Sequence, residues 1–337
     1  MTAPPLLAVQ DLRVTLSTPR GPAEALRGVS FSLERGQTLG LIGESGCGKS
    51  ITALALMGLL PDAAQVAGAI TLDGQPLLGL AEADWCQLRG NRLAMVFQEP
   101  MTALNPLHTI GRQIAESLRL HKRLDAAAAR AEALRLLQRV QLPQAARRLD
   151  AYPHQLSGGQ RQRVVIAIAL ACGPDLLIAD EPTTALDVTI QREVLDLIAQ
   201  LVSEDGMALL LISHDLGVMA ENVQRMLVMY GGTVVESGPT DAVFAHLAHP
   251  YTRGLFAARP GLGLRAENAA LTGRRGRRLA TIPGRVPELI DLPAGCGFAD
   301  RCALAIDDCR RAPPPEIELT PGHAARCIRL DAVAAMP

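Results

Sequence analysis

The stretch that decides the fold is Gly43-Glu44-Ser45-Gly46-Cys47-Gly48-Lys49-Ser50. It lies between an apolar run at 37–42 and a helix-forming run at 50–60, which predicts a strand, a tight loop and a helix in that order. Glycines let such a loop turn its N–H groups inward around a phosphate, and the positive end of the following helix adds to the attraction. We expect Lys49 to reach the β- and γ-phosphate oxygens of a nucleotide and the Ser50 hydroxyl to bind Mg²⁺. The next residue, Ile51, is included among the expected nucleotide contacts.

Carboxylates follow a second apolar run, at 176–180, which is predicted to be a buried parallel strand. Asp180 at its end is expected in the Mg²⁺ shell, and Glu181 is expected to accept a proton from the attacking water as a general base. His214 follows the apolar run 208–213 and is expected to hold the γ-phosphate and the water in place. Gln98, after the strand predicted at 93–97, is expected to contact Mg²⁺ and the water. These residues predict an ATPase.

A second anion site is predicted at Leu156-Ser157-Gly158-Gly159-Gln160, which opens a helix expected over 161–171. Ser157 is a favourable N-cap, and the two glycines expose the N–H groups of the first turn. One phosphate cannot easily use this site and the glycine loop within one subunit. We therefore expect two subunits, head to tail, to enclose ATP between the loop of one and this helix of the other.

The order of the predicted elements indicates an α/β phosphate-loop core with an antiparallel β subdomain before it and a helical insertion, at about 99–172, inside it. Strands are predicted at 6–16 and 25–33, with a Pro/Gly loop at 19–22 between them, and a hairpin at 226–236. The expected domains are a nucleotide-binding domain over 1–255, a basic linker over 256–282 and a small cysteine-containing extension over 283–337.

Composition limits the possible partners. The chain has 33 basic and 34 acidic residues, a balance that argues against a dedicated nucleic-acid binder. It has no run of about 18–20 apolar residues and no N-terminal signal pattern, so we expect a cytosolic chain that meets a membrane through partners. Lys49 and Lys122 are its only lysines, which makes a lysine inside the glycine loop a specific signal.

Taken together, these motifs resemble those of the ATP-binding-cassette (ABC) ATPases, over about residues 6–255, with 156–160 as their signature segment. The resemblance implies ATP-driven closure of a cassette dimer, then hydrolysis and opening. It also implies that Asp187 couples the two sites across the dimer. DNA-repair cassettes carry a long coiled coil between loop and signature, and ribosome-associated ones carry two cassettes. Neither feature occurs in this chain, although a soluble cassette of that kind remains an alternative.

Four segments are similar to those of the dipeptide/oligopeptide importer ATPases: 43–46, 97–106, 152–154 and 179–189. That resemblance implies an ATPase on the cytoplasmic face of the inner membrane, bound peripherally to two permease subunits and served by an extracytoplasmic solute-binding protein. A groove beside the helical insertion would receive a short permease helix, with Gln98 relaying the nucleotide state. The second cassette is expected to be a related chain, giving a heterodimer. Nickel or another non-peptide solute is the alternative cargo.

Two positions in the nucleotide region carry further expectations. The family usually has an aromatic residue near position 16 to stack on adenine, and Leu16 stands there instead. Since stacking on a base is worth roughly 1–3 kcal/mol, we expect weakened ATP affinity and poor discrimination against GTP. Cys47 lies inside the loop, so a thiol reagent is expected to block hydrolysis and bound nucleotide to protect.

Four of the seven cysteines gather near the C-terminus, at Cys296, Cys302, Cys309 and Cys327. A cytosolic chain rarely keeps disulfides, and four thiolates can hold Zn²⁺ or a [4Fe–4S] cluster. The spacing lacks the Cys-x-x-Cys pairs common in zinc sites and leaves zinc, a cluster and free thiols open. The segment 296–302 resembles the C-terminal extension of the peptide-importer ATPases, and this resemblance implies the [4Fe–4S] cluster.

Overall fold

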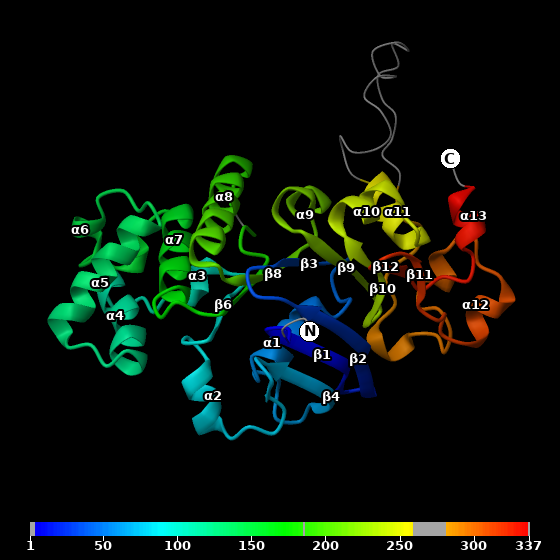
Figure 1. The fold of residues 1–337 in the computed structure, drawn as a ribbon, viewed down its shortest axis with the longest axis horizontal. Coiled ribbons are helices and arrows are strands. Elements are labelled where there is room, and N and C mark those ends of the chain that lie inside the picture. The colour runs from blue at the N-terminus through cyan, green and yellow to red at the C-terminus, as the bar shows by residue number, and fades with distance from the viewer. Residues whose placement is uncertain (1–3, 185, 259–280, 336–337) are drawn as a thin grey trace, which may run out of the picture.

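The computed structural model describes residues 4–184, 186–258 and 281–335 and contains two sheets (Figure 1). The larger sheet has eight strands in the order β11-β12-β10-β9-β3-β8-β7-β6. Its strands are β3 (Thr38–Ile42), β6 (Leu93–Val96), β7 (Leu176–Asp180), β8 (Ala208–Ser213), β9 (Arg225–Tyr230), β10 (Thr233–Pro239), β11 (Ile317–Thr320) and β12 (His323–Ala325). Five of them, β6, β7, β8, β3 and β9, are parallel to one another, and the rest continue the sheet antiparallel.

The central parallel strands are buried on both faces. Along β7, Leu176 and Ile178 point into the core beneath the sheet, whereas Leu177 and Ala179 point into the core on the other face. β8 alternates in the same way. A strand that buries both faces needs an unbroken apolar run, and for this reason the sequence predicts β7 and β8 with their observed bounds.

The smaller sheet is antiparallel and lies below the larger one (Figure 1). It contains β1 (Leu7–Thr18), β2 (Gly21–Leu33), β4 (Gln65–Leu72) and β5 (Gln75–Pro76). The helix α1 (Lys49–Leu56) contributes to the core that the two sheets share. The predicted antiparallel subdomain is thus confirmed, with the strands longer than expected, because β2 already begins at Gly21 within the loop predicted at 19–22.

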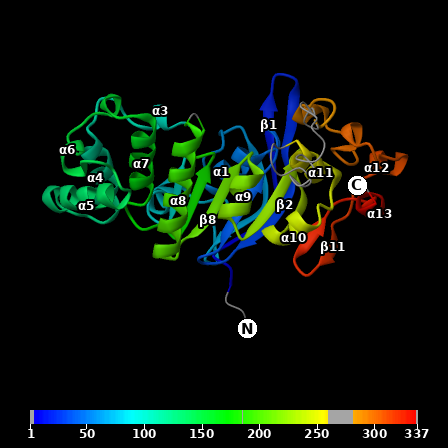
Figure 2. The same cartoon turned by 90° about the horizontal axis from the view of Figure 1, so that it is seen from above.

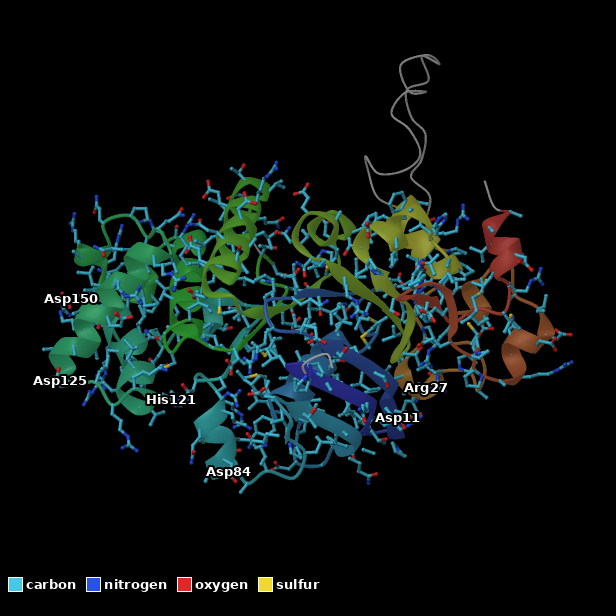
Figure 3. The ribbon with its side chains drawn as sticks, in the orientation of Figure 1. Asp11, Arg27, Asp84, His121, Asp125 and Asp150 are labelled. Atoms are coloured by element: carbon cyan, nitrogen blue, oxygen red, sulfur yellow. The ribbon has the colours of Figure 1, made fainter. Side chains whose placement is uncertain are left out.

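A helical region follows β6 and forms one end of the molecule. It consists of α3 (Pro100–Ala103), α4 (Ile110–His121), α5 (Ala126–Arg139), α6 (Ala145–Arg148) and α7 (Gly158–Ala169). Arg130 of α5 makes two hydrogen bonds to Asp150, at 2.7 and 2.8 Å, and Asp150 lies with Asp125 at the outer end of this region (Figure 3). This region corresponds to the predicted helical insertion.

Seen from above, α8 (Val188–Asp205), α9 (Leu216–Asn222), α10 (Thr240–Ala245) and α11 (Pro250–Ala257) lie over the larger sheet (Figure 2). None of the helices that the structure describes is long and apolar enough to cross a membrane. Sequence patterns did not predict α8 or the short helix α2 (Glu82–Leu88) between β5 and β6.

Two helix bounds differ from the predicted ones. The helix expected over 50–60 ends at Leu56, since Gly58 has a φ of 61° and a Cβ there would lie 2.4 Å from the Trp85 ring. The helix expected over 161–171 begins earlier, at Gly158, because the Ser157 side chain already caps it. Both differences come from single residues at helix ends.

The C-terminal segment is built onto the larger sheet. Its β12 pairs with β10 through Glu236 and Ala325, and β11 pairs with β12 in turn. The remaining elements are the short helices α12 (Asp307–Arg311) and α13 (Leu330–Ala334) and the 3-10 turns η3 (Leu289–Asp291) and η4 (Ala299–Arg301). The basic run at 274–278 in the predicted linker lies outside the described residues.

A buried polar pair fastens this segment to the core. Nε2 of His323 on β12 lies 3.0 Å from Oε1 of Glu236 on β10, and both side chains are completely buried. Glu236 also accepts hydrogen bonds from the N–H groups of Ala248 and His249. The carboxylate therefore ties three segments together.

Replacing His323 by Ala should lower the free energy of unfolding by about 1–3 kcal/mol, because the Glu236 carboxylate then stays buried with one partner fewer. Urea unfolding of the variant against the wild-type chain measures the loss, with Thr320→Ala, an exposed change on the same hairpin, as the control. Equal midpoints for the two variants would contradict this role of the pair.

Candidate active site

The glycine loop begins where the central strand β3 ends. At two of its positions the backbone geometry explains why the residue is glycine. A Cβ on Gly43 would lie 2.3 Å from the carbonyl oxygen of Met229. Gly48, the N-cap of α1, has a φ of 106°, in the left-handed region that side chains disfavour. The loop therefore presses against β9 while it reverses the chain into α1, as the sequence predicts for a phosphate-binding loop.

The Lys49 ammonium is folded back into this loop. Its Nζ donates to the carbonyl oxygens of Gly43, at 2.8 Å, and Glu44, at 3.1 Å, and the side chain is buried. The positive charge thus sits inside the ring of loop backbone where the phosphates of a nucleotide are expected.

Ser50 and Asp180 lie together next to the loop. The Ser50 side chain lies beside the Asp180 carboxylate and lowers its pKa, but burial has the larger effect and raises the pKa of Asp180 above its usual value. Oδ1 of Asp180 is buried and has no hydrogen-bond partner among the described residues. A buried carboxylate oxygen without a partner, beside a hydroxyl, suits a hard cation such as Mg²⁺.

The remaining three predicted catalytic residues converge on one oxygen atom. Oε2 of Glu181 lies 3.3 Å from Nδ1 of His214 and 3.3 Å from Nε2 of Gln98. The hydrogen bond with His214 is the main reason why the pKa of Glu181 is lowered, and the same bond raises the pKa of His214. Glu181 is therefore ionised at neutral pH and can accept a proton.

Two features of this cluster were missed by sequence reasoning. The Thr184 hydroxyl donates to the same Glu181 oxygen at 3.0 Å. Its place three residues after Glu181 in the sequence is the signal that could have predicted this contact. Glu181 also has a φ of 45°, an unusual value for a residue with a side chain. Such strain is concentrated at functional sites, where the surrounding structure enforces it.

The predicted signature segment lies on the helical side of the sheet, at the start of α7. Ser157 Oγ accepts the N–H of Gln160 at 3.4 Å, and Oε1 of Gln160 accepts the N–H of Ser157 at 3.2 Å, which is a capping box. A Cβ on Gly159 would lie 2.7 Å from Ile190, so α8 can approach α7 only at a glycine. Asp187 caps α8 through the N–H of Ile190.

In Figure 1, α7 lies beyond β6, while α1 lies beneath the middle of the sheet. The signature segment and the glycine loop are thus on separate elements, as the argument for two subunits requires. The other expected contacts are placed differently with respect to solvent: Ser45, Gly46 and Ser50 are exposed, whereas Cys47 and Gly48 are buried and Ile51 is half-buried.

The four C-terminal cysteines surround one cavity. Cys296, Cys302, Cys309 and Cys327 line it together with His249 and Phe298, and its volume is about 20 Å³. Burial raises the pKa of Cys296 to about 11, and the three other thiols contribute. Among the described residues, however, no three or more His, Cys, Asp or Glu side chains are arranged to hold a metal ion.

Comparison with known proteins adds the following. A model of the ABC transporter family matches residues 26–184, and a model of the oligopeptide/dipeptide transporter C-terminal region matches residues 235–309. A Sinorhizobium fredii protein, named "Probable peptide ABC transporter ATP-binding protein y4tR", is 49% identical over 332 residues, which are 97% of this chain and 96% of the relative.

The Mycobacterium tuberculosis "Oligopeptide transport ATP-binding protein OppD" is 48% identical over 98% of this chain, which spans 52% of that protein. Among solved structures, the dimeric ATP-binding cassette MJ0796 bound to ADP and Pi is similar with a TM-score of 0.62. It is 27% identical, and the match covers 69% of this chain and 98% of that one.

Cys47 allows a direct test of the loop. The thiol is completely buried, and burial raises its pKa, so the modification expected from the sequence needs the loop to open first. With a charged thiol reagent at neutral pH, exposed Cys86 should be labelled first and Cys47 at least about tenfold more slowly, as mass spectrometry of the peptides will measure. Labelling of Cys47 as fast as that of Cys86 would contradict the observed loop packing.

Proposed function

The chain belongs to the ABC transporter ATP-binding proteins of the oligopeptide/dipeptide branch, and from this premise we propose that it hydrolyses ATP to power a membrane importer of di- or oligopeptides. The observation that carries the proposal is the convergence of Gln98, Glu181 and His214 beside the phosphate loop. A relative matched over nearly its whole length and named for peptide transport supports the choice of cargo.

ATP binding is assigned to the loop residues 43–51, with Lys49 moving from its backbone carbonyls to the β- and γ-phosphates. We assign Mg²⁺ to Ser50 and Asp180, with Gln98 as a further contact; the unpartnered Oδ1 of Asp180 supports this. Bound there, Mg²⁺ neutralises charge on the transferred phosphoryl group. Leu16 is half-buried against the core, and weak discrimination against GTP stays a prediction.

Hydrolysis is assigned to Glu181 as general base. A water molecule attacks the γ-phosphorus, its proton passes to the Glu181 carboxylate, and the bond to the ADP oxygen breaks. His214, Gln98 and Thr184 hold the carboxylate in place through the three contacts to its Oε2. His214 is also free on its exposed side to hold the γ-phosphate.

A second cassette is proposed to complete the site. Its residues 157–160 would bind the γ-phosphate across the interface with the N–H groups that open α7, and its Asp187 would couple the two sites. The dimeric cassette with ADP and Pi among the structural relatives supports this arrangement. A related second chain, giving a heterodimer, remains our preferred form.

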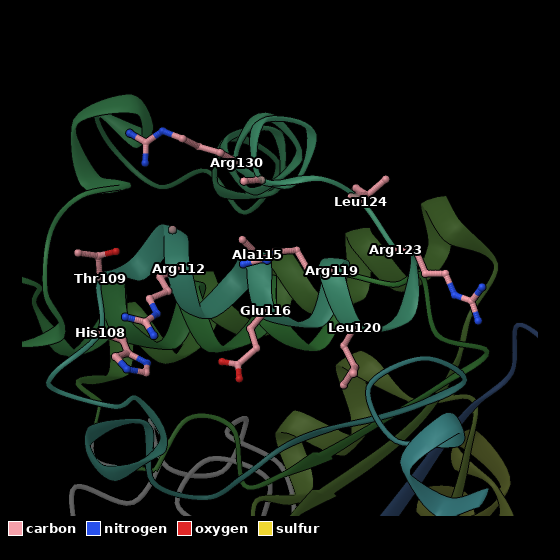
Figure 4. A pocket seen from close by; sticks show the side chains of 12 residues that line it. His108, Thr109, Arg112, Ala115, Glu116, Arg119, Leu120, Arg123, Leu124 and Arg130 are labelled. Atoms are coloured by element: carbon pink, nitrogen blue, oxygen red, sulfur yellow. The ribbon is translucent and has the colours of Figure 1, made fainter. Parts of the chain in front are cut away.

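Docking to two permease subunits is assigned to the helical insertion. A groove of about 760 Å³ runs along α4, and His108, Arg112, Glu116 and Leu120 lie along one side of this helix (Figure 4). Leu107 and Leu120 are 81% and 68% exposed, which is unusual for leucines without a partner. We propose that a short permease helix covers them, that Gln98 relays the nucleotide state, and that the chain works peripherally at the cytoplasmic face of the inner membrane beside a solute-binding protein.

The division of the chain into a cassette over 1–255, a linker over 256–282 and an extension over 283–337 is also a proposal. The continuation of the sheet by β11 and β12 means that such an extension packs on the cassette. Relatives named for peptide transport favour peptides over the alternative cargo, nickel or another small solute, and favour an importer over the second alternative, a cassette acting on DNA or ribosomes.

Glu181→Gln should reduce ATP hydrolysis by on the order of 100- to 10,000-fold while ATP still binds, because only the proton acceptor is lost. Phosphate release and nucleotide affinity measure the two effects. Glu221→Gln is the control, because Glu221 is exposed and lies near the end of α9 that is farther from His214. Undiminished hydrolysis in Glu181→Gln would refute the assignment of the base.

The same variant tests the transport function. Purified from detergent-solubilised native membranes with Mg-ATP, it should bring down two permease subunits and a second cassette, which mass spectrometry identifies. Recovery of ribosomal or DNA-associated proteins alone would refute the importer function and favour the second alternative.

For the four C-terminal cysteines we propose a [4Fe–4S] cluster, with zinc as the alternative. Four thiolates are the donor set that such a cluster requires, and four thiols around one cavity support the assignment. The cavity has room for about one water molecule, so loading requires the thiols to move apart.

Protein purified without oxygen should therefore be brown and contain about four iron atoms per chain. Replacing Cys296 and Cys302 by Ser should remove the colour, and replacing the exposed Cys86 should not. A colourless protein loaded with zinc would refute the cluster and support the alternative.

A further inference from the structure

Glu44, the second residue of the phosphate loop, is held by groups from three elements. Lys49 donates to its carbonyl oxygen, and the Tyr251 hydroxyl accepts its N–H at 2.7 Å. The Arg301 guanidinium donates two hydrogen bonds to its carboxylate, at 2.6 and 3.1 Å. Arg301 belongs to η4 in the C-terminal segment, 257 residues further along the chain.

Contacts outside the phosphate loop also hold the Arg301 side chain in place. Its Nε donates to the carbonyl oxygen of Pro283 at 2.9 Å, and its guanidinium lies 5.8 Å from the ring centroids of both Tyr230 and Phe298. The side chain is 5% exposed. Arginine presents its donors in a rigid planar fork, so a fixed guanidinium also fixes the orientation of the carboxylate that it binds.

ATP binding disturbs one of the three ties. The Lys49 ammonium bridges the carbonyl oxygens of Gly43 and Glu44, and with only three N–H donors it must share or give up these bonds when it binds phosphate oxygens. The two ties that remain on Glu44, from Tyr251 and Arg301, both come from the C-terminal part of the chain. They are therefore the contacts that can keep this part of the loop in shape while the lysine is engaged.

We propose that Arg301 is a positioning residue of the nucleotide site, which holds the phosphate loop through the Glu44 carboxylate while Lys49 binds the nucleotide. The inference rests on the proposed ATPase function and extends it: the C-terminal segment takes part in nucleotide binding.

The same tie reaches the cysteine-lined cavity. Arg301 directly precedes Cys302, and Phe298, which lines the cavity, packs edge-on against Tyr230 and lies 5.4 Å from the Tyr251 ring. The segment that surrounds the four thiols thus supplies Arg301, which holds the phosphate loop. Through Phe298 it also contacts Tyr251, which holds the same loop. A ligand held by the four thiols would therefore act on the same segment that positions Glu44.

Steady-state ATP hydrolysis by the full chain, with KM and kcat measured separately, tests the role of Arg301. Arg301→Gln should raise the KM for ATP about tenfold, with a smaller change in kcat. An effect of this size is common when the interaction between two contacting residues, here Arg301 and Glu44, is lost. Arg301→Lys keeps the charge without the fork and should restore part of the affinity. Glu44→Gln should match Arg301→Gln, and the double variant should be no worse than either single one.

Arg20→Gln is the matched control. Arg20 also joins the C-terminal segment to the cassette, through exposed pairs with Glu288 and Asp291, but it does not contact the phosphate loop. A KM in Arg301→Gln equal to that in Arg20→Gln, or additive effects in the double variant, would overturn the proposal. If Arg301→Gln does not fold, Glu44→Gln and Arg301→Lys decide, because a normal KM in both overturns it as well.

Nucleotide affinity by calorimetry on the same variants separates this inference from the proposed function. A wild-type chain that binds ATP without hydrolysing it, alone or with its partners, would refute the ATPase function. The positioning role would fail instead if Arg301→Gln bound ATP as tightly as the wild-type chain.

Discussion

The register of three parallel strands is the constraint on which the site depends. Ile42 of β3 pairs with Ser213 of β8, and Ile212 of β8 pairs with Asp180 of β7, so the three strands end at one edge of the sheet. The residues that follow these ends are the phosphate loop, Glu181 and His214. Ligands of open α/β sheets bind at the carboxyl ends of the strands. A shift of one residue in the pairing of β7 with β8 would move Glu181 away from His214.

The two neighbouring carboxylates at the end of β7 are prepared for different tasks. Asp180 is buried beside Ser50, and burial raises its pKa. A bound cation would stabilise its ionised form. Glu181 is held by His214 and Thr184, which lower its pKa and keep it ionised. Adjacent groups whose environments shift their pKa values in opposite directions are a common sign of divided catalytic roles.

Sequence patterns could predict whatever depends on local order. Unbroken apolar runs predicted β7 and β8, and the glycine loop predicted β3 and α1. The ends of the predicted strands indicated the cluster of Gln98, Glu181 and His214. Long-range contacts lie beyond such patterns. Nothing near Glu44 points to Arg301, since the contact is set by how the C-terminal segment packs. The burial of Cys47 depends on packing around the loop, and the spacing of the cysteines did not show that all four line one cavity.

The pairing of β12 with β10 has a consequence for the behaviour of the molecule in solution. Without β11 and β12, β10 would be the last strand of the larger sheet, with a row of unpaired N–H and C=O groups open to other chains. Exposed edges of this kind template intermolecular strand pairing and aggregation. The C-terminal hairpin ends the sheet instead with the short strand β11, whose residues Glu318 to Thr320 are exposed. The hairpin therefore protects the edge of β10 from pairing with strands of other chains.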